Sequence, residues 1–184
     1  MELAKRKHPR LRGYDYSQNQ AYFITVCTAD KRPTLSCVTT AQIELSQIGL
    51  VLDEQIRHLP NRYPNVTIDH YVIMPTHFHL LLSIRRNAEY ESAEGASPFP
   101  TRGKDAESGL AERTRAGVSL SQVIGACKSL TTRIANQREQ RPGRVLFQSS
   151  FHDHIIRDER DYLQHWQYID DNPAKWADDP YYCD

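Results

Sequence analysis

The chain has 184 residues, of which 39% are hydrophobic and 25% charged, and this composition predicts one folded domain over residues 1–184. Lysines and arginines number 23, as do aspartates and glutamates, so the formal net charge is zero and taken alone argues against a nucleic-acid partner. Apolar runs are too short to cross a bilayer, and the basic N-terminus lacks the apolar stretch of a secretory signal. We therefore expect a cytoplasmic protein with no membrane partner.

The four cysteines, Cys27, Cys37, Cys127 and Cys183, lie far apart and form no closely spaced pair. This pattern fits neither a zinc knuckle nor a disulfide framework. We expect four reduced thiols, two of them in the core.

The neutral total hides an uneven distribution of charge. Residues 1–12 and residues 128–144 each hold five basic side chains against one acidic one, whereas residues 158–184 hold eight acidic side chains against two basic ones. Such runs are typical of solvated surfaces, but the two basic runs are also suited to binding phosphate.

The first half of the chain predicts a strand, a helix and a strand pair. Residues 22–28 are rich in β-branched and aromatic side chains and indicate a strand, and residues 40–59 place apolar side chains at helical spacing before Pro60. Residues 66–74 and 77–84 then alternate in hydropathy, which indicates two strands joined by a tight turn at Pro75-Thr76.

The second half begins with residues 86–117, which show no period and too few apolar residues to order themselves, as in a flexible insertion. A helix follows over 119–136, capped by Ser119 or Ser121, then a strand or strand pair over 145–157 and a helix over 157–172. This order predicts an α+β fold: a ferredoxin-like (split βαβ) antiparallel sheet with flanking helices and an added C-terminal helix.

Two histidines occupy alternate positions of a predicted strand. His77 and His79 therefore point to the same side, and two neutral imidazoles side by side can hold one divalent metal ion if a third ligand completes the site. The spacing alone does not distinguish a metal-binding pair from two histidines that are merely hydrogen-bonded or exposed. His152 and His154 form a competing pair, but an aspartate separates them and no clean strand pattern surrounds them.

A tyrosine and an asparagine lie one turn apart on the last predicted helix. The phenol of Tyr168 and the amide of Asn172 can converge on one point. Asn172 could then be a third metal ligand and Tyr168 a nucleophile. The alternative is a core aromatic residue and an ordinary helix end before Pro173. Tyr162 is a competitor, but one turn on it meets Trp166, which offers no ligand oxygen.

Together these motifs resemble those of a known family. The segment Met74-Pro75-Thr76-His77-Phe78-His79-Leu80-Leu81, followed far downstream by Tyr168-Ile169-Asp170-Asp171-Asn172-Pro173, resembles the Y1 HUH transposases of the IS200/IS605 type, and more narrowly the REP-associated tyrosine transposases. Residues 10–17, 22–28 and 154–159 are also similar to that subgroup. The likeness covers nearly the whole chain outside residues 86–117.

The resemblance implies a single-stranded DNA endonuclease and strand transferase. His77, His79 and Asn172 would hold a Mg²⁺ or Mn²⁺ ion, and Tyr168, on the C-terminal helix, would attack the scissile phosphate to leave a 5′-phosphotyrosine and a free 3′-OH. The third ligand of the insertion-sequence relatives is usually a glutamine; in this chain Asn172 takes its place, which resembles the REP-associated branch, where an asparagine also does so.

The implied partner is a REP-like palindrome folded as a hairpin with a single-stranded foot. Phosphate contacts and base stacking would come from the basic N-terminal arm, residues 1–20, and from the downstream basic run, through Arg10, Arg12, Tyr14, Tyr16, Lys128 and Arg133. We expect a monomer or homodimer in the bacterial cytoplasm, associated with the nucleoid through DNA. Two alternatives are a metal-dependent phosphodiesterase that activates water and a non-catalytic hairpin-binding module.

Overall fold

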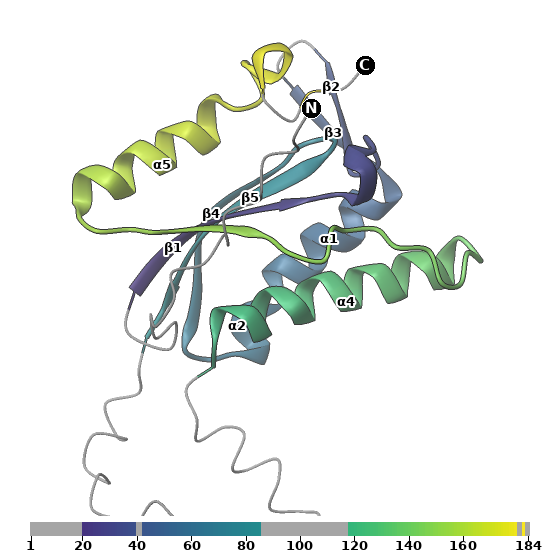
Figure 1. Ribbon diagram of the computed structural model, residues 1–184, viewed down its shortest axis with the longest axis horizontal. Helices are drawn as coiled ribbons and strands as arrows, with labels where there is room; N and C mark the ends of the chain where they lie inside the picture. The colour runs from purple at the N-terminus through teal and green to yellow at the C-terminus, as the bar shows by residue number, and fades with distance from the viewer. Residues whose placement is uncertain (1–19, 40–41, 86–117, 180–181, 183–184) are drawn as a thin grey trace, which may run out of the picture.

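The computed structural model describes residues 20–39, 42–85, 118–179 and 182, and its centre is a four-stranded sheet (Figure 1). The strands are β1 (Gln20–Cys27), β4 (Val66–Ile73), β5 (His77–Ile84) and β6 (His152–Ile155). They run in the order β4-β5-β1-β6, and every neighbouring pair is antiparallel. The predicted ferredoxin-like sheet is confirmed.

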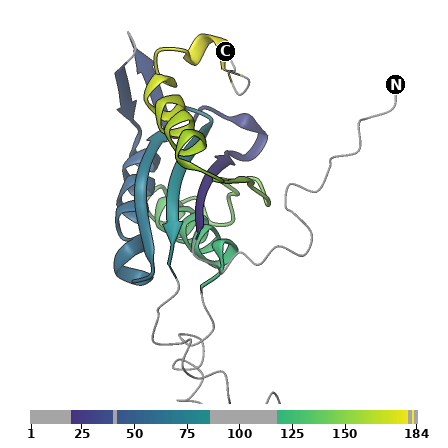
Figure 2. The ribbon, with the colours of Figure 1, turned by 90° about the vertical axis from the view of Figure 1, so that its left-hand side faces the viewer.

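The β5 strand lies inside the sheet, paired with β1 along its whole length from Cys27 opposite His77 to Gln20 opposite Ile84. On its other side the Pro75-Thr76 turn leads back to β4, and the Met74 amide donates to the His77 carbonyl at 2.9 Å. Both edges of β5 are therefore paired, and because helices cover both faces of the sheet (Figure 2), side chains at the start of β5 are buried on either face.

Helices cover the two faces of the sheet differently (Figures 1 and 2). The helices α1 (Gln47–Arg57), α2 (Leu59–Arg62) and α4 (Leu120–Arg138) lie on one face, and α5 (Glu159–Asp171) lies across the other. Short 3₁₀ turns, η1 (Ala29–Lys31) and η3 (Trp176–Asp178), follow β1 and α5.

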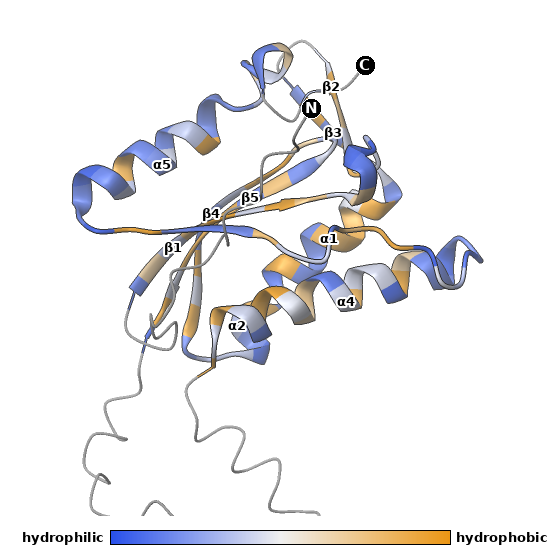
Figure 3. Ribbon diagram, in the orientation of Figure 1, coloured by the Kyte–Doolittle hydropathy of each residue, from blue (hydrophilic) through white to orange (hydrophobic). Residues whose placement is uncertain are grey.

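The main core lies between the sheet and the pair α1 and α4. Phe78, Leu80 and Leu82 of β5 point into it and are fully buried, as the alternation in the sequence predicts. A smaller cluster on the opposite face joins Leu81 to Ile169 of α5. Figure 3 shows the contrast, since the strands and the inner sides of α1 and α4 carry most of the hydrophobic colour whereas α5 is largely hydrophilic.

Each long helix begins at a side-chain cap. Ser46 accepts a hydrogen bond from the Gly49 amide, and Asp158 accepts one from the Asp161 amide. Ser119 and Gln122 form a reciprocal capping box at the start of α4, so of the two predicted caps Ser119 is the one used.

The helix predicted over residues 40–59 is wrong at its start. Residues before Ser46 form a separate hairpin of β2 (Ser36–Thr39) and β3 (Gln42–Leu45), and α1 begins only at Gln47. Leu45 lies three residues before Ile48 and so continues the helical spacing, whereas the two-residue step from Ile43 to Leu45 is that of one face of a strand. The strand predicted within 145–157 shrinks to β6, preceded by an isolated bridge between Thr28 and Phe147.

Among the cysteines, Cys27 and Cys127 are buried and Cys37 is exposed, whereas Cys183 lies outside the described residues. Within the described ranges, none of the helices combines the length and hydropathy that a bilayer span requires. Residues 1–19 of the predicted arm and the predicted insertion 86–117 also lie outside the described residues.

The close approach of α1 to the preceding loop gives a stability prediction. A Cβ atom at Gly49 would lie 2.0 Å from the Leu35 carbonyl oxygen, whereas a Cβ atom at Gly125 of α4 would meet nothing within 4 Å. We expect Gly49→Ala to lower the free energy of unfolding by about 1–3 kcal/mol through the steric overlap. Gly125→Ala, the control, should raise it by about 0.5–1 kcal/mol through helix propensity.

Denaturant titration of the two variants checks this pair. Equal and small effects of the two substitutions would contradict the close packing of α1 against Leu35.

Candidate functional site

Two buried imidazoles at the start of β5 form the centre of the candidate site. His77 is 0% exposed and His79 is 1% exposed. Their Nε2 atoms face each other at 3.0 Å, with the ring planes inclined at 68°. The predicted same-side arrangement is therefore present, and both imidazole tips are directed at one point.

The other nitrogen of each ring is held by a threonine. Thr25 Oγ1, on the neighbouring strand β1, lies 2.9 Å from His79 Nδ1, and Thr76 Oγ1 lies 3.3 Å from His77 Nδ1. Such contacts at Nδ1 fix ring orientation and leave Nε2 available as a ligand atom.

Burial keeps both imidazoles neutral. It lowers the pKa of His77 to about 3, with a further contribution from the charge of Lys31. It also lowers the pKa of His79 well below the usual value, and the neighbouring His77 adds to the effect. Neutral imidazole is the form that binds a metal ion, so neither ring has to lose a positive charge before a metal ion binds at neutral pH.

Asp179 joins this pair from the C-terminal end of the chain, and the sequence analysis did not identify it. Its side chain is 3% exposed, and its Oδ2 atom lies 3.9 Å from His77 Nε2. One ligand atom from each of His77, His79 and Asp179 falls within 4.8 Å of the others. The only sequence signal was the acidic character of residues 158–184, which does not select one carboxylate.

Tyr168 and Asn172 reach the same region from α5. Tyr168 is 41% exposed, and its ring meets the His79 ring edge-on with centroids 5.1 Å apart. Asn172, the C-cap of α5, is 4% exposed, and its buried Oδ1 accepts no hydrogen bond from the described residues. The Asn172 side chain hydrogen-bonds the Tyr168 phenol, and the Tyr168 ring in turn contacts His79. Coordination of a metal ion would satisfy the buried Oδ1 atom, which is otherwise costly to leave without a partner.

The phenol of Tyr168 is held in its protonated form. Burial raises its pKa, and the negative charge of Asp179 raises it further, while a hydrogen bond from the side chain of Asn172 acts in the opposite direction. Ionisation of this phenol therefore requires nearby positive charge.

Polar and aromatic contacts fix α5 over the sheet. His70 Nε2 of β4 lies 2.7 Å from Asp170 Oδ1, and the Trp166 ring stacks on His70 with centroids 4.4 Å apart. Phe23 of β1 stacks on His79 and meets Tyr168 edge-on. Tyr162 packs near Trp166 instead and makes no described contact with the His77–His79 pair.

The competing histidine pair does not join this site. His152 is exposed, whereas His154 contacts Asp161 and His165, which form a second cluster.

The two predicted DNA-binding residues that the structure describes do not lie at the histidine pair. Lys128 and Arg133 lie on α4, on the opposite face of the sheet from α5 (Figure 2). Lys128 Nζ donates to the carbonyls of Gln148 at 2.6 Å and Ser149 at 3.0 Å, which fixes the segment before β6. The remaining candidates, Arg10, Arg12, Tyr14 and Tyr16, lie outside the described residues.

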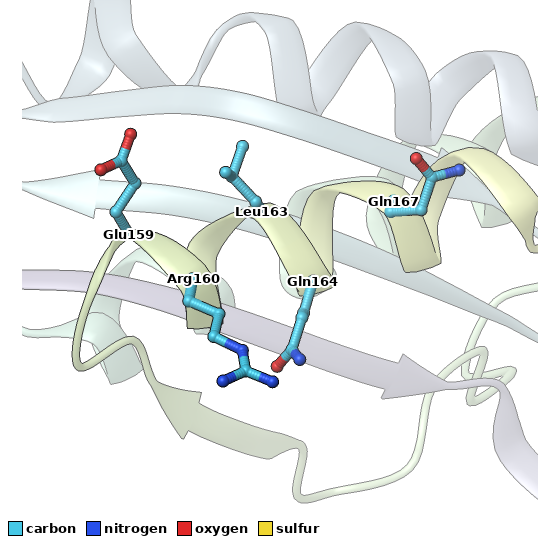
Figure 4. A pocket seen from close by; sticks show the side chains of 5 residues that line it. All are labelled: Glu159, Arg160, Leu163, Gln164 and Gln167. Atoms are coloured by element: carbon cyan, nitrogen blue, oxygen red, sulfur yellow. The ribbon is translucent and has the colours of Figure 1, made fainter.

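A shallow hollow of about 450 Å³ lies on α5 itself. Figure 4 shows the side chains that line it, all from one helix: Glu159, Arg160, Leu163, Gln164 and Gln167. None of them belongs to either histidine cluster, so the hollow is separate from the candidate site.

Comparison with known proteins finds a protein of similar sequence and a solved structure of similar fold. No protein-family model matches the chain. A Haemophilus influenzae protein described only as uncharacterized is 29% identical over 181 residues, which cover 97% of this chain and 94% of the relative. A solved structure of a REP-associated tyrosine transposase bound to a REP hairpin is 22% identical and covers 90% of this chain and 73% of its own, with a TM-score of 0.53. The two chains share a fold, as the resemblance in the sequence implied.

The contact between Thr25 and His79 gives a prediction for metal binding. Thr25→Val keeps the shape of the buried side chain but removes the oxygen next to Nδ1. We expect it to weaken Mn²⁺ binding by about tenfold, the usual effect of losing a partner behind a ligand. Thr67→Val, at an exposed position of β4, is the control. Calorimetric titration measures both, and equal affinities in the two variants would contradict an orienting role for Thr25.

Proposed function

We propose that this protein is a metal-dependent single-stranded DNA endonuclease and strand transferase that works through a covalent tyrosine intermediate. The observation that carries the proposal is the half-exposed Tyr168 ring placed edge-on against the buried, neutral His79. A nucleophile must be accessible to its substrate, whereas an imidazole ligand must be neutral and shielded from solvent. Tyr168 meets the first requirement and His79 meets the second.

His77, His79 and Asn172 would hold the ion, Mg²⁺ or Mn²⁺. When bound, the ion polarises the phosphoryl oxygens of the scissile phosphate and offsets the charge that develops there. Two imidazole nitrogens suit Mn²⁺ better than Mg²⁺, which prefers oxygen ligands. Asp179 supplies a carboxylate at the same point, close enough to complete the set with one hard ligand.

Tyr168 would be the nucleophile. Its phenolic oxygen forms a bond to phosphorus, and its proton passes to the solvent that reaches this half-exposed side chain. The bond from phosphorus to the 3′ oxygen breaks, and that oxygen takes up a proton from solvent. The products are a 5′-phosphotyrosine and a free 3′-OH. Because a phosphodiester is exchanged for another, a later 3′-OH can attack the phosphotyrosine and rejoin strands without another energy source.

The proposed substrate is hairpin DNA with a single-stranded foot, of the REP type. The shared fold with a tyrosine transposase that was solved on a REP hairpin supports this choice. Unpaired bases could stack on the aromatic side chains of the N-terminal arm, with Arg10 and Arg12 contacting phosphates, since single strands are bound by aromatic surfaces and cationic grooves.

The nucleophile is tested by removing one oxygen. We expect Tyr168→Phe to abolish the denaturant-resistant adduct with a labelled REP-like hairpin in the presence of Mn²⁺, because no phenolic oxygen remains to bond phosphorus. Hairpin affinity should stay within about twofold, since the ring and its packing are kept. Tyr162→Phe, on the same helix, is the matched control and should form the adduct as the parent does. Denaturing gels and a filter-binding assay read the two quantities.

Each other outcome identifies a different function. Cleavage without adduct in both the parent and Tyr168→Phe would indicate a phosphodiesterase that activates water. Tight binding with no cleavage at all, indifferent to chelator, would indicate a binding module. An adduct that persists in Tyr168→Phe would contradict this assignment of the nucleophile.

The metal requirement is tested separately. We expect EDTA or His79→Ala to reduce the rate of adduct formation by about a hundredfold or more, because the charge on the phosphoryl oxygens is then uncompensated. His58→Ala, an exposed histidine next to α1, should leave the rate unchanged. Full activity of the His79→Ala protein, or of the parent protein in EDTA, would exclude the proposed metal centre.

A further inference from the structure

A second group of potential ligands lies on the side of α5 that faces β6. His154 comes from β6, and Asp161 and His165 lie one turn apart on α5. One ligand atom from each falls within 4.8 Å of the others. The three side chains are 42%, 18% and 22% exposed respectively, so the group is open to solvent on one side.

The contacts within this group are short, and those of His154 join β6 to α5. His154 Nε2 lies 2.9 Å and 3.0 Å from the two carboxylate oxygens of Asp161, and His165 Nδ1 lies 3.1 Å from Oδ1. The two imidazole rings stack with centroids 4.6 Å apart. Two imidazoles therefore lie against one carboxylate, all brought together by the packing of α5 beside β6.

The carboxylate is kept charged and oriented. Burial opposes its ionisation, but hydrogen bonds from His154 and from the Arg157 amide outweigh this and lower the pKa of Asp161. The Arg157 amide donates to Oδ2 at 3.0 Å, which holds the carboxylate in place from behind. An oriented, ionised carboxylate is a ready ligand for a cation.

The donor set is two imidazole nitrogens and one carboxylate oxygen, which is suited to zinc and its neighbours among the divalent transition metals. Three protein ligands leave a fourth position for water or a phosphate oxygen. The Nδ1 atom of His165 also lies 2.8 Å from the Asp161 carbonyl, so a metal ion at Nδ1 would replace this hydrogen bond, and the proton of the neutral ring would then lie on Nε2.

We propose that His154, Asp161 and His165 form a second divalent transition-metal site of the zinc class, distinct from the His77–His79 site. A single ring separates the two, because Phe23 packs on His79 at 5.0 Å and on His165 at 4.5 Å between centroids. An ion in this second site is a fixed positive charge on the flank of the Tyr168 helix. It offsets the acidic first turn of α5, where Glu159 and Asp161 lie.

Equilibrium dialysis of the full chain against Zn²⁺ tests the site directly. All proteins carry Cys37→Ser, which removes an exposed thiol that would bind zinc. We expect the His165→Asn protein to bind one equivalent less than its parent, or to bind the second equivalent about tenfold more weakly. His152→Asn, an exposed histidine on the same strand as His154, is the matched control and should bind as the parent does.

A second background separates this site from the first. In a His77→Ala variant one equivalent of bound Zn²⁺ should remain, and it should be lost when His165→Asn is added. The visible absorption of Co²⁺, bound in place of Zn²⁺, reports the same site. Circular dichroism checks that each variant is folded. Zinc stoichiometry that is unchanged by both His154→Asn and His165→Asn would overturn the proposal, as would the absence of a His77-independent equivalent. Neither result depends on DNA cleavage, so the proposed nuclease function can fail while this site stands.

Discussion

The arrangement of this protein depends on burying two imidazoles side by side at the start of an interior strand. A charged imidazole at this depth would be costly, so His77 and His79 are stable there only as neutral rings whose nitrogens are satisfied. Thr25 and Thr76 satisfy the outer nitrogens, and the inner ones are left directed at each other. The interior position of β5 makes this possible, because strands on both sides hold the backbone fixed.

The two faces of the sheet have different roles: one holds the core that stabilises the fold, and the other holds the candidate functional residues. The face under α1 and α4 holds nearly all of the large buried apolar side chains, so the fold is stabilised there. The face under α5 holds a small apolar cluster surrounded by histidines, carboxylates and aromatic rings. Polar groups can therefore be concentrated over β5 without weakening the main core, and Figure 3 shows the resulting hydrophilic helix.

What could be predicted from the sequence was set by local geometry. Residues two apart on a strand share a side, which placed His77 with His79, and residues four apart on a helix share a face, which placed Tyr168 with Asn172. The β2–β3 hairpin was missed because Leu45, three residues before Ile48, extends the helical pattern of α1 toward the N-terminus, although Ile43 and Leu45 are spaced as on one face of a strand. Asp179 could not be selected among eight acidic residues, since its approach to His77 depends on how the chain folds back after α5.

The same limit applies to His154, which the sequence paired with His152. The structure pairs it with Asp161 and His165 instead, because β6 turns directly into α5 and brings the first turns of that helix against the strand. A strand pattern predicts which side a residue faces, but not which helix covers that side.

The attachment of α5 determines how its stability relates to that of the whole fold. Of its 13 residues only Ile169 is buried. Its other contacts with the sheet include the His70–Asp170 and His154–Asp161 pairs, ring contacts, and the packing of the partly buried Tyr162 and Trp166. We therefore expect α5 to belong to the part of the molecule that opens locally at a lower free energy than global unfolding. Its amide protons should exchange with solvent ahead of those of β5, so that Tyr168 can leave the sheet while His77 and His79 stay in place.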